Sequence, residues 1–175
     1  MLTASLALAD ELGLAALTMQ GVADRLGVTP MALYRHVTNK ADLLDGLVER
    51  ILLEVPVPDP DDPWPDRLSA LARGTRRAAL RHPQVFPLLL QRAAVTPGAR
   101  RTRDVVYAAL REAGLAEPDV IQLERVLATV ILGFAASEAG GRFAAHPAEQ
   151  VDADFAFVQE MLANVVLSAI ARAGV

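Results

Sequence analysis

The chain has 175 residues, of which 53% are hydrophobic and 22% are charged, and its formal net charge is −4. This length suits one domain, or a small domain joined to a larger one, and the apolar content excludes a disordered chain. The absence of Cys excludes disulfides, thiolate zinc sites and a Cys nucleophile, and it suits a reducing compartment.

The N-terminal stretch MLTASLALADELGLAAL lacks the basic start of an export signal, and Asp10 and Glu11 interrupt its apolar run. The longest uncharged stretches, residues 126–137 and 161–171, are shorter than the about 20 residues that a membrane-spanning helix needs. We therefore expect a cytoplasmic protein with no membrane partner.

Apolar residues recur at helical spacing along nearly the whole chain, and no run shows the alternation that is typical of a strand. The spacing predicts an all-α fold. The first helix is expected over residues 2–12, because Gly13 is a suitable C-terminal stop.

A helix-turn-helix layout follows. Thr18 is the expected N-cap of one helix, and Gly27 supplies the positive φ of the turn after it. Thr29 and Pro30 suit the N-cap and the first position of the next helix. Ala23 is small enough for a close helix crossing, and we expect a shared core of Val22, Leu26, Val28 and Leu33. In such a motif the second helix presents its first residues to base edges in the major groove.

A fourth helix is expected to begin at Asn39, with Asp42 as the reciprocal partner of this N-cap, and to end near Val55. Residues 55–67, VPVPDPDDPWPDR, contain five Pro and four Asp and are the one clear linker. Beyond the linker the spacing predicts helices at about 64–81, 83–92, 97–113, 117–140 and 150–173.

The stretch LTMQGVADRLGVTPMALYRHVTNKADLLDGLVE resembles the DNA-binding domain of the tetracycline-repressor (TetR) family. The segments RLSALARGTRRAALRHP, TPGAR and GFAASEAG resemble, more weakly, the C-terminal region of one large branch of that family. The resemblance implies a three-helix DNA-binding domain at residues 1–46 and a larger helical ligand-binding and dimerisation domain at residues 47–175.

By position, the resemblance implies that Tyr34 and Lys40 contact DNA phosphates and that His36 contacts a phosphate or a base. The implied base-reading positions are Gln20, Thr29, Pro30, Met31 and Arg35. Gln pairs in a bidentate manner with adenine and Arg with guanine, so Gln20 and Arg35 are the best candidates for polar readout. Pro30 and Met31 offer apolar contact alone.

Structural roles are the alternative for three of these residues. Tyr34 is also compatible with a half-buried core aromatic, His36 with a helix-end cap and Met31 with a packing residue. Lys40 at a helix N-terminus opposes the helix dipole, which favours the phosphate role.

Residues 1–50 carry four basic and six acidic side chains, whereas a DNA-binding module is usually basic. The TetR family usually has a basic segment before its first helix, and this chain starts inside that helix. We therefore expect that the domain at residues 1–46 is N-terminally incomplete or that its affinity is low. Acidic residues such as Asp24, Asp42 and Asp45 that face away from DNA would still leave a positive local field.

The predicted helices at 117–140 and 150–173 are apolar on more than one side. A helix of this kind lies at the centre of a fold or packs against a partner. We expect a homodimer formed by these two helices from each subunit, which sets two reading units about 34–36 Å apart on a palindromic DNA operator. A thick monomer core is the alternative.

Residues 67–111 contain ten Arg and one acidic residue, Asp104. We expect a solvated face neutralised by the acidic linker and by Glu112, Glu117 and Asp119. An anionic ligand or a second nucleic-acid surface is the alternative, although no aromatic residues are interleaved for base stacking.

The resemblance also implies a ligand pocket among the fourth to eighth helices. The candidate contacts are Trp64, His82, Phe86, Tyr107, Gln122 and Arg125. Tetracycline binders of the family use an Asn, a Phe and a metal-binding His at positions that correspond here to Leu71, Thr75 and Leu89. We therefore expect no metal, no cofactor and an effector other than metal–tetracycline.

An enzyme is not expected. The three His, at positions 36, 82 and 146, are scattered, and no Gly-rich phosphate loop follows a strand. The interpretation that explains both halves is a ligand-responsive transcriptional regulator, a repressor that a small-molecule effector releases from its operator. The alternative is a helical small-molecule binding or carrier protein with a vestigial helix-turn-helix.

Overall fold

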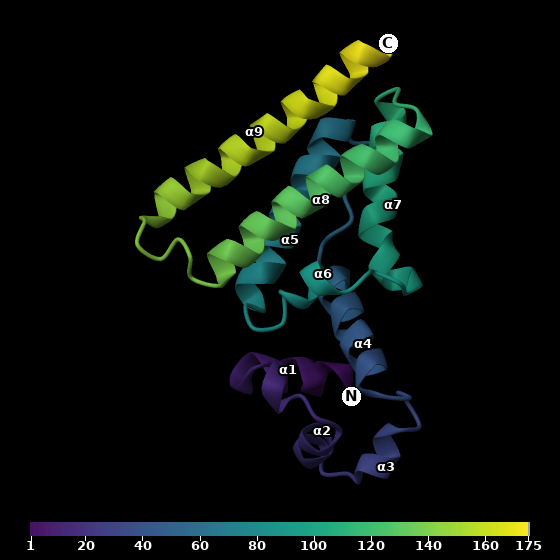
Figure 1. The fold of residues 1–175 in the computed structure, drawn as a ribbon, viewed down its shortest axis with the longest axis vertical. Helices are drawn as coiled ribbons and strands as arrows, with labels where there is room; N and C mark the ends of the chain where they lie inside the picture. The colour runs from purple at the N-terminus through teal and green to yellow at the C-terminus, as the bar shows by residue number, and fades with distance from the viewer. Residues whose placement is uncertain (175) are drawn as a thin grey trace.

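A computed structural model describes residues 1–174, which leaves only Val175 of the predicted second domain outside it. This part of the chain is helical and contains no strand (Figure 1). Its helices are α1 (Leu2–Leu12), a 3₁₀ turn (Leu14–Ala16), α2 (Met19–Leu26), α3 (Pro30–Leu33), α4 (Lys40–Leu53), α5 (Trp64–Arg81), α6 (Leu88–Gln91), α7 (Pro97–Glu112), α8 (Glu117–Ala139) and α9 (Ala148–Ala173). The predicted all-α fold is confirmed.

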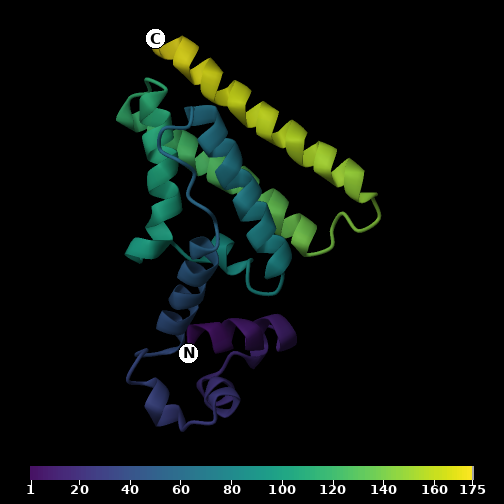
Figure 2. The ribbon, with the colours of Figure 1, turned by 180° about the vertical axis from the view of Figure 1, so that it is seen from behind.

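The helices form two units that α4 joins. The N-terminal unit, α1 to α3, packs against the first half of α4, and α4 leads from it into the C-terminal unit, α5 to α9 (Figure 1). In the C-terminal unit α5, α7 and α8 pack against one another, and both views show α9 running beside α8 along the outer edge (Figures 1 and 2).

The turn between α2 and α3 forms as the sequence predicts. The Thr18 hydroxyl oxygen accepts a hydrogen bond from the Gly21 N–H at 2.9 Å and so caps α2. Gly27 has a φ of 66°, in the left-handed region that a side chain disfavours, and the Val28 N–H closes the turn by donating to the Ala23 carbonyl at 3.0 Å.

Other parts of the expected motif differ. The helix that begins at Pro30 has four residues, and the Thr29 hydroxyl makes no capping hydrogen bond. Leu26 and Val28 are 37% and 43% exposed, so the prediction that they share the core with Val22 and Leu33 is wrong. Both flank Gly27 in an exposed turn, and their side chains therefore lie at its surface.

The start of α4 follows the predicted cap with a shift of one residue. The Asn39 side-chain oxygen accepts from the Asp42 N–H at 3.0 Å. The Asp42 carboxylate accepts from the Thr38 N–H at 2.9 Å, rather than from that of Asn39. This arrangement fixes the direction in which α4 leaves the N-terminal unit.

The predicted helix at 83–92 is largely absent. The chain turns at residues 83–87, and only α6, Leu88–Gln91, is helical. Pro83 and Pro87 both lack an N–H donor and restrict the residue before them, which accounts for the turn. The predicted helices at 64–81, 97–113, 117–140 and 150–173 are present within one or two residues at each end.

The expected solvated arginine face is present only in part, because five of the ten arginines are exposed and the other five are buried or half-buried. Arg67, Arg76 and Arg111 form ion pairs that connect α5, α7, α8 and α9. Arg67 is 4% exposed and pairs with Glu112, and Arg111 pairs with Glu117 at 2.7 Å. The predicted acidic partners Glu112 and Glu117 are therefore correct, but the pairs lie between helices rather than on one open face.

The two longest helices, α8 and α9, have the length and composition of membrane spans, with mean hydropathies of 1.5 and 1.4. In this fold α8 packs against α5, α6, α7 and α9 as a core helix. Part of the apolar surface of α8 and α9 remains uncovered, because Val126, Phe157, Met161 and Leu167 are between 40% and 66% exposed.

Candidate DNA-binding face and central cavity

The eight residues proposed for DNA contact lie on one continuous segment, residues 20–40. Here they are called the DNA-binding face: Gln20, Thr29, Pro30, Met31, Tyr34, Arg35, His36 and Lys40. All are exposed except Pro30, which is half-buried. Met31 is 75% exposed, so the alternative role of packing residue does not fit it. Tyr34 is 50% exposed, so its phosphate role and the alternative of a half-buried aromatic both stay open.

Ion pairs neutralise some of the acidic side chains of residues 1–50. Glu11 is held by Arg25 at 2.5 Å, and Asp45 is held by Arg92 of the C-terminal unit at 2.7 Å. Within residues 1–174, Arg35 and Lys40 form no ion pair. Two unpaired cations therefore remain on the DNA-binding face although the acidic residues of residues 1–50 outnumber the basic ones.

The Gln20 amide is positioned by a neighbour one turn along α2. Its NH₂ group donates to the Asp24 carboxylate at 2.6 Å. An amide NH₂ has two hydrogens, so the second hydrogen and the amide oxygen remain free for a base edge. This arrangement keeps the bidentate contact to adenine available while it limits the rotation of the side chain.

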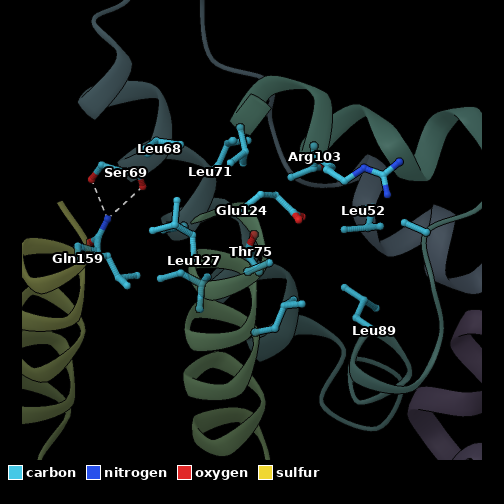
Figure 3. A pocket seen from close by; sticks show the side chains of 18 of the residues that line it. Leu52, Leu68, Ser69, Leu71, Thr75, Leu89, Arg103, Glu124, Leu127 and Gln159 are labelled. Carbon is cyan, nitrogen blue, oxygen red and sulfur yellow. Dashed lines mark hydrogen bonds between the residues drawn. The ribbon is translucent and has the colours of Figure 1, made fainter. Parts of the chain in front are cut away.

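A cavity of ≈ 480 Å³, here called the central cavity, lies in the C-terminal unit. Its walls come from α4 to α9 and are mainly aliphatic, as Figure 3 shows for Leu52, Leu71 and Leu127. This volume is within the range of small-molecule sites, about 300–1,000 Å³.

Polar groups interrupt the apolar wall at a few points. The Gln159 amide of α9 donates to the Ser69 hydroxyl of α5 at 2.7 Å, so this pair is internally satisfied (Figure 3). Glu124 points into the cavity, and burial raises the pKa of its carboxyl above the ordinary 4.5, while Arg103 and Arg125 nearby lower it by less (Figure 3). Arg103 of α7 also lines the cavity, and its buried Nε has no hydrogen-bond partner.

Of the six candidate ligand contacts, the structure places only Trp64 in the lining of the central cavity. Phe86 is fully buried in the core, and the Tyr107 ring lies beneath Arg103 and Arg111. Gln122 and Arg125 are exposed on α8 outside the cavity lining. The residues that the sequence reasoning missed include Ser69, Arg103, Glu124 and Gln159.

His82, the sixth candidate, lies at the junction of the two units. It is 8% exposed, and its Nδ1 is 2.6 Å from the Asp10 carboxylate of α1 while its Nε2 is 3.1 Å from the Glu54 carboxylate that follows α4. Arg81 also pairs with Glu54, so this group, here called the His82 junction, connects α1, α4 and α5.

Helix α4 touches both the DNA-binding face and the central cavity. Its first residue is Lys40, and Val48 and Leu52 further along contribute to the cavity wall. Arg92, which lines the cavity, donates to the Asp45 carboxylate and to the Ala41 carbonyl at 3.1 Å. Arg92 thus connects the cavity wall to the helix that carries Lys40.

The chain was compared with known proteins. Residues 1–47 match the family described as "Bacterial regulatory proteins, tetR family", and residues 56–174 match "Tetracyclin repressor-like, C-terminal domain". The chain belongs to the TetR family. Both parts of the resemblance read from the sequence are confirmed.

Relatives within the TetR family include two curated bacterial regulators. An "HTH-type transcriptional regulator" of Saccharopolyspora erythraea is 33% identical over 78% of this chain, and the "HTH-type transcriptional repressor DrrR1" of Streptomyces coeruleorubidus is 30% identical over 94% of it. The chain spans 58% and 62% of the lengths of these two proteins.

The fold is also that of solved TetR structures. BioQ of Mycobacterium smegmatis is 27% identical, with a TM-score of 0.82 over 96% of each chain. BioQ has also been solved with its double-stranded DNA operator, and that structure matches 95% of this chain with a TM-score of 0.78.

The three positions at which tetracycline-binding TetR proteins carry their anchors can now be located. Leu71, Thr75 and Leu89 all line the central cavity. None of these side chains coordinates a metal ion through nitrogen or carboxylate, and residues 1–174 contain no cluster of three His, Cys, Asp or Glu that could hold one. That metal–tetracycline is not an effector of this chain stays a prediction.

Proposed function

We propose that this TetR protein is a ligand-responsive transcriptional repressor of the cytoplasm, which binds a palindromic operator as a homodimer and is released from it by a small-molecule effector. The observation that carries the proposal is the position of α4. One end of this helix bears Lys40 of the DNA-binding face, and its middle forms part of the wall of the central cavity.

The DNA-binding part of the proposal rests on exposure and charge. Arg35 and Lys40 are exposed and form no ion pair in the described residues, and Gln20 is held ready by Asp24. Phosphate contacts position a protein on DNA, and base contacts specify the sequence. We assign Tyr34 and Lys40 to the first role and Gln20 and Arg35 to the second.

The homodimer rests on the uncovered apolar surface of the last two helices. Val126, Phe157, Met161 and Leu167 are exposed on α8 and α9. Pairing α8 and α9 with the same helices of a second copy covers these side chains and sets two DNA-binding faces on one side of the dimer.

The effector part follows from coupling. A ligand changes operator affinity only if it binds the two states of the protein with different affinities. A ligand that fills the central cavity contacts Val48 and Leu52 and thereby favours one position of α4. That position sets the separation of the two DNA-binding faces.

The proposal is tested by fluorescence anisotropy with labelled DNA from the region flanking the protein's own gene, at about 0.15 M salt. Specific binding at least about a thousandfold tighter than to random DNA is expected. Equal affinity for both DNAs would contradict the repressor function and favour a small-molecule carrier.

A further inference from the structure

Two charged side chains that line the central cavity form no ion pair, although Arg103 lies over the Tyr107 ring and acts, with Arg125, on the charge of Glu124. Glu124 of α8 and Arg103 of α7 both line it, and neither forms an ion pair or a side-chain hydrogen bond with any of residues 1–174. Arg76, by contrast, pairs with Glu138 and Asp152, each at 2.6 Å. Partly buried charges without partners are costly and are retained where a ligand uses them.

The charges around the cavity favour a positive ligand. Five ionisable side chains line it: Asp66, Arg92, Arg103, Glu124 and Glu160. The charge of Arg92 is offset by Asp45, which lies outside the lining. Three carboxylates and the Arg103 guanidinium therefore remain in the lining, and Arg125, outside the lining, also acts on Glu124. Asp66 and Glu160 are exposed and so lie where the cavity meets solvent, whereas Glu124 is inside it.

The surroundings of Glu124 distinguish it from the carboxylates at the opening. Desolvation by the apolar wall outweighs the effect of Arg103 and Arg125 on this carboxyl group. A desolvated carboxylate is stabilised more by the positive charge of a bound ligand than an exposed carboxylate is. Trp64, also in the lining, adds an aromatic face of the kind that attracts organic cations.

We propose that the central cavity binds a mainly apolar organic cation, whose ammonium group pairs with Glu124 while its apolar body contacts the aliphatic wall. The inference rests on the proposed function, because it names the chemical class of the effector. Arg103 is the internal competitor of this ligand, since its guanidinium occupies the same side of the cavity as the Glu124 carboxylate (Figure 3).

The test compares two fluorescent dyes with one xanthene ring system, the cation rhodamine 123 and the anion fluorescein, by anisotropy titration of the whole chain near neutral pH. Rhodamine 123 is expected to bind at least about tenfold more tightly. Fluorescein binding of equal or higher affinity would overturn the proposal, as would the absence of rhodamine 123 binding up to about 100 µM.

Three single variants assign the preference to a residue. Glu124→Gln keeps the shape of the side chain and is expected to weaken rhodamine 123 binding about tenfold without weakening fluorescein binding. Arg103→Gln is expected to leave rhodamine 123 binding unchanged or to strengthen it. Glu149→Gln, the control, removes an exposed carboxylate of α9 outside the cavity lining and is expected to change affinity less than about threefold, because its charge is solvated.

An unchanged rhodamine 123 affinity in Glu124→Gln would overturn the proposal. Thermal unfolding of each variant confirms that it is folded. The operator assay separates this inference from the proposed function. Rhodamine 123 binding with the expected charge preference, but without effect on operator affinity, supports the cation site and contradicts its role as an effector site.

Discussion

The DNA-binding face and the central cavity differ in how far apart along the chain their residues lie. The DNA-binding face is contained within residues 20–40, whereas the lining of the central cavity extends from Val48 to Ala163. The face is shaped by local caps and one Gly turn, and the cavity by the packing of six helices, α4 to α9. The DNA-binding face is therefore built from local structure, whereas the central cavity exists only when the whole C-terminal unit is assembled.

The largest expected effect lies at the His82 junction, where the N-terminal unit and the C-terminal unit meet. His82→Ala leaves the Asp10 and Glu54 carboxylates, 24% and 18% exposed, without their shared partner. We expect a loss of about 2 kcal/mol in the free energy of unfolding, which is less than for a fully buried pair because water reaches both groups. Urea denaturation measures it. His146→Ala, at an exposed position, is the control, and an equal effect in both variants would show that the junction contributes no stability.

A smaller effect is expected for Gln20→Ala, which tests the local character of the DNA-binding face. The loss of a bidentate base contact relaxes the preference at one base pair by about 1–2 kcal/mol and leaves dye binding in the central cavity unchanged. Anisotropy with a set of operators mutated one pair at a time measures this. Asp24→Ala removes the support of Gln20 but not its amide, so a smaller relaxation at the same pair is expected.

Lys40→Ala is expected to weaken binding to operator DNA and to random DNA by a similar factor, about three- to tenfold. It should also lower the slope of log affinity against log salt concentration by about one. A phosphate contact carries no sequence information, so the ratio of the two affinities stays constant. Arg142→Ala, in the loop between α8 and α9, removes an exposed charge outside the DNA-binding face and serves as the control. A loss confined to the operator would instead assign Lys40 to base readout.

The smallest effect concerns pH. Burial alone would raise the pKa of Glu54, but hydrogen bonds from Arg81 and His82 outweigh it and lower the pKa from 4.5. Folding thus favours the ionised carboxylate. Its contribution, less than about 1 kcal/mol, is present above pH 4.5 and is lost as the pH falls through the folded-state value. Unfolding curves of the wild type and Glu54→Gln should converge below pH 4.5, and a constant difference would contradict the assignment.

The sequence predicted best what depends on neighbouring residues. Thr18, Gly27 and Asn39 are each defined by a contact within five residues, and all three have the expected geometry. The sequence did not predict the exposure of Leu26 and Val28. For a hydrophobic residue next to a turn, the sequence does not indicate whether the side chain points to the core or to solvent.

The central cavity was predicted less well because its lining is defined by tertiary packing. Trp64 was identified, but Glu124 and Arg103 are separated along the chain by 21 positions and face the same space only because α7 packs on α8. His82 was expected to contact a ligand, and its two carboxylate partners are 72 and 28 positions away.

Helix α9 belongs to two surfaces at once. Gln159 and Leu162 lie in the wall of the central cavity, and Phe157 and Met161 are exposed on the same helix, where the second subunit is proposed to pack. Linkage makes such a relation reciprocal: any free energy by which the second subunit alters the affinity of the cavity is returned as an equal change in subunit affinity when the cavity is filled. The dissociation constant for the ligand then varies with the concentration of the protein itself.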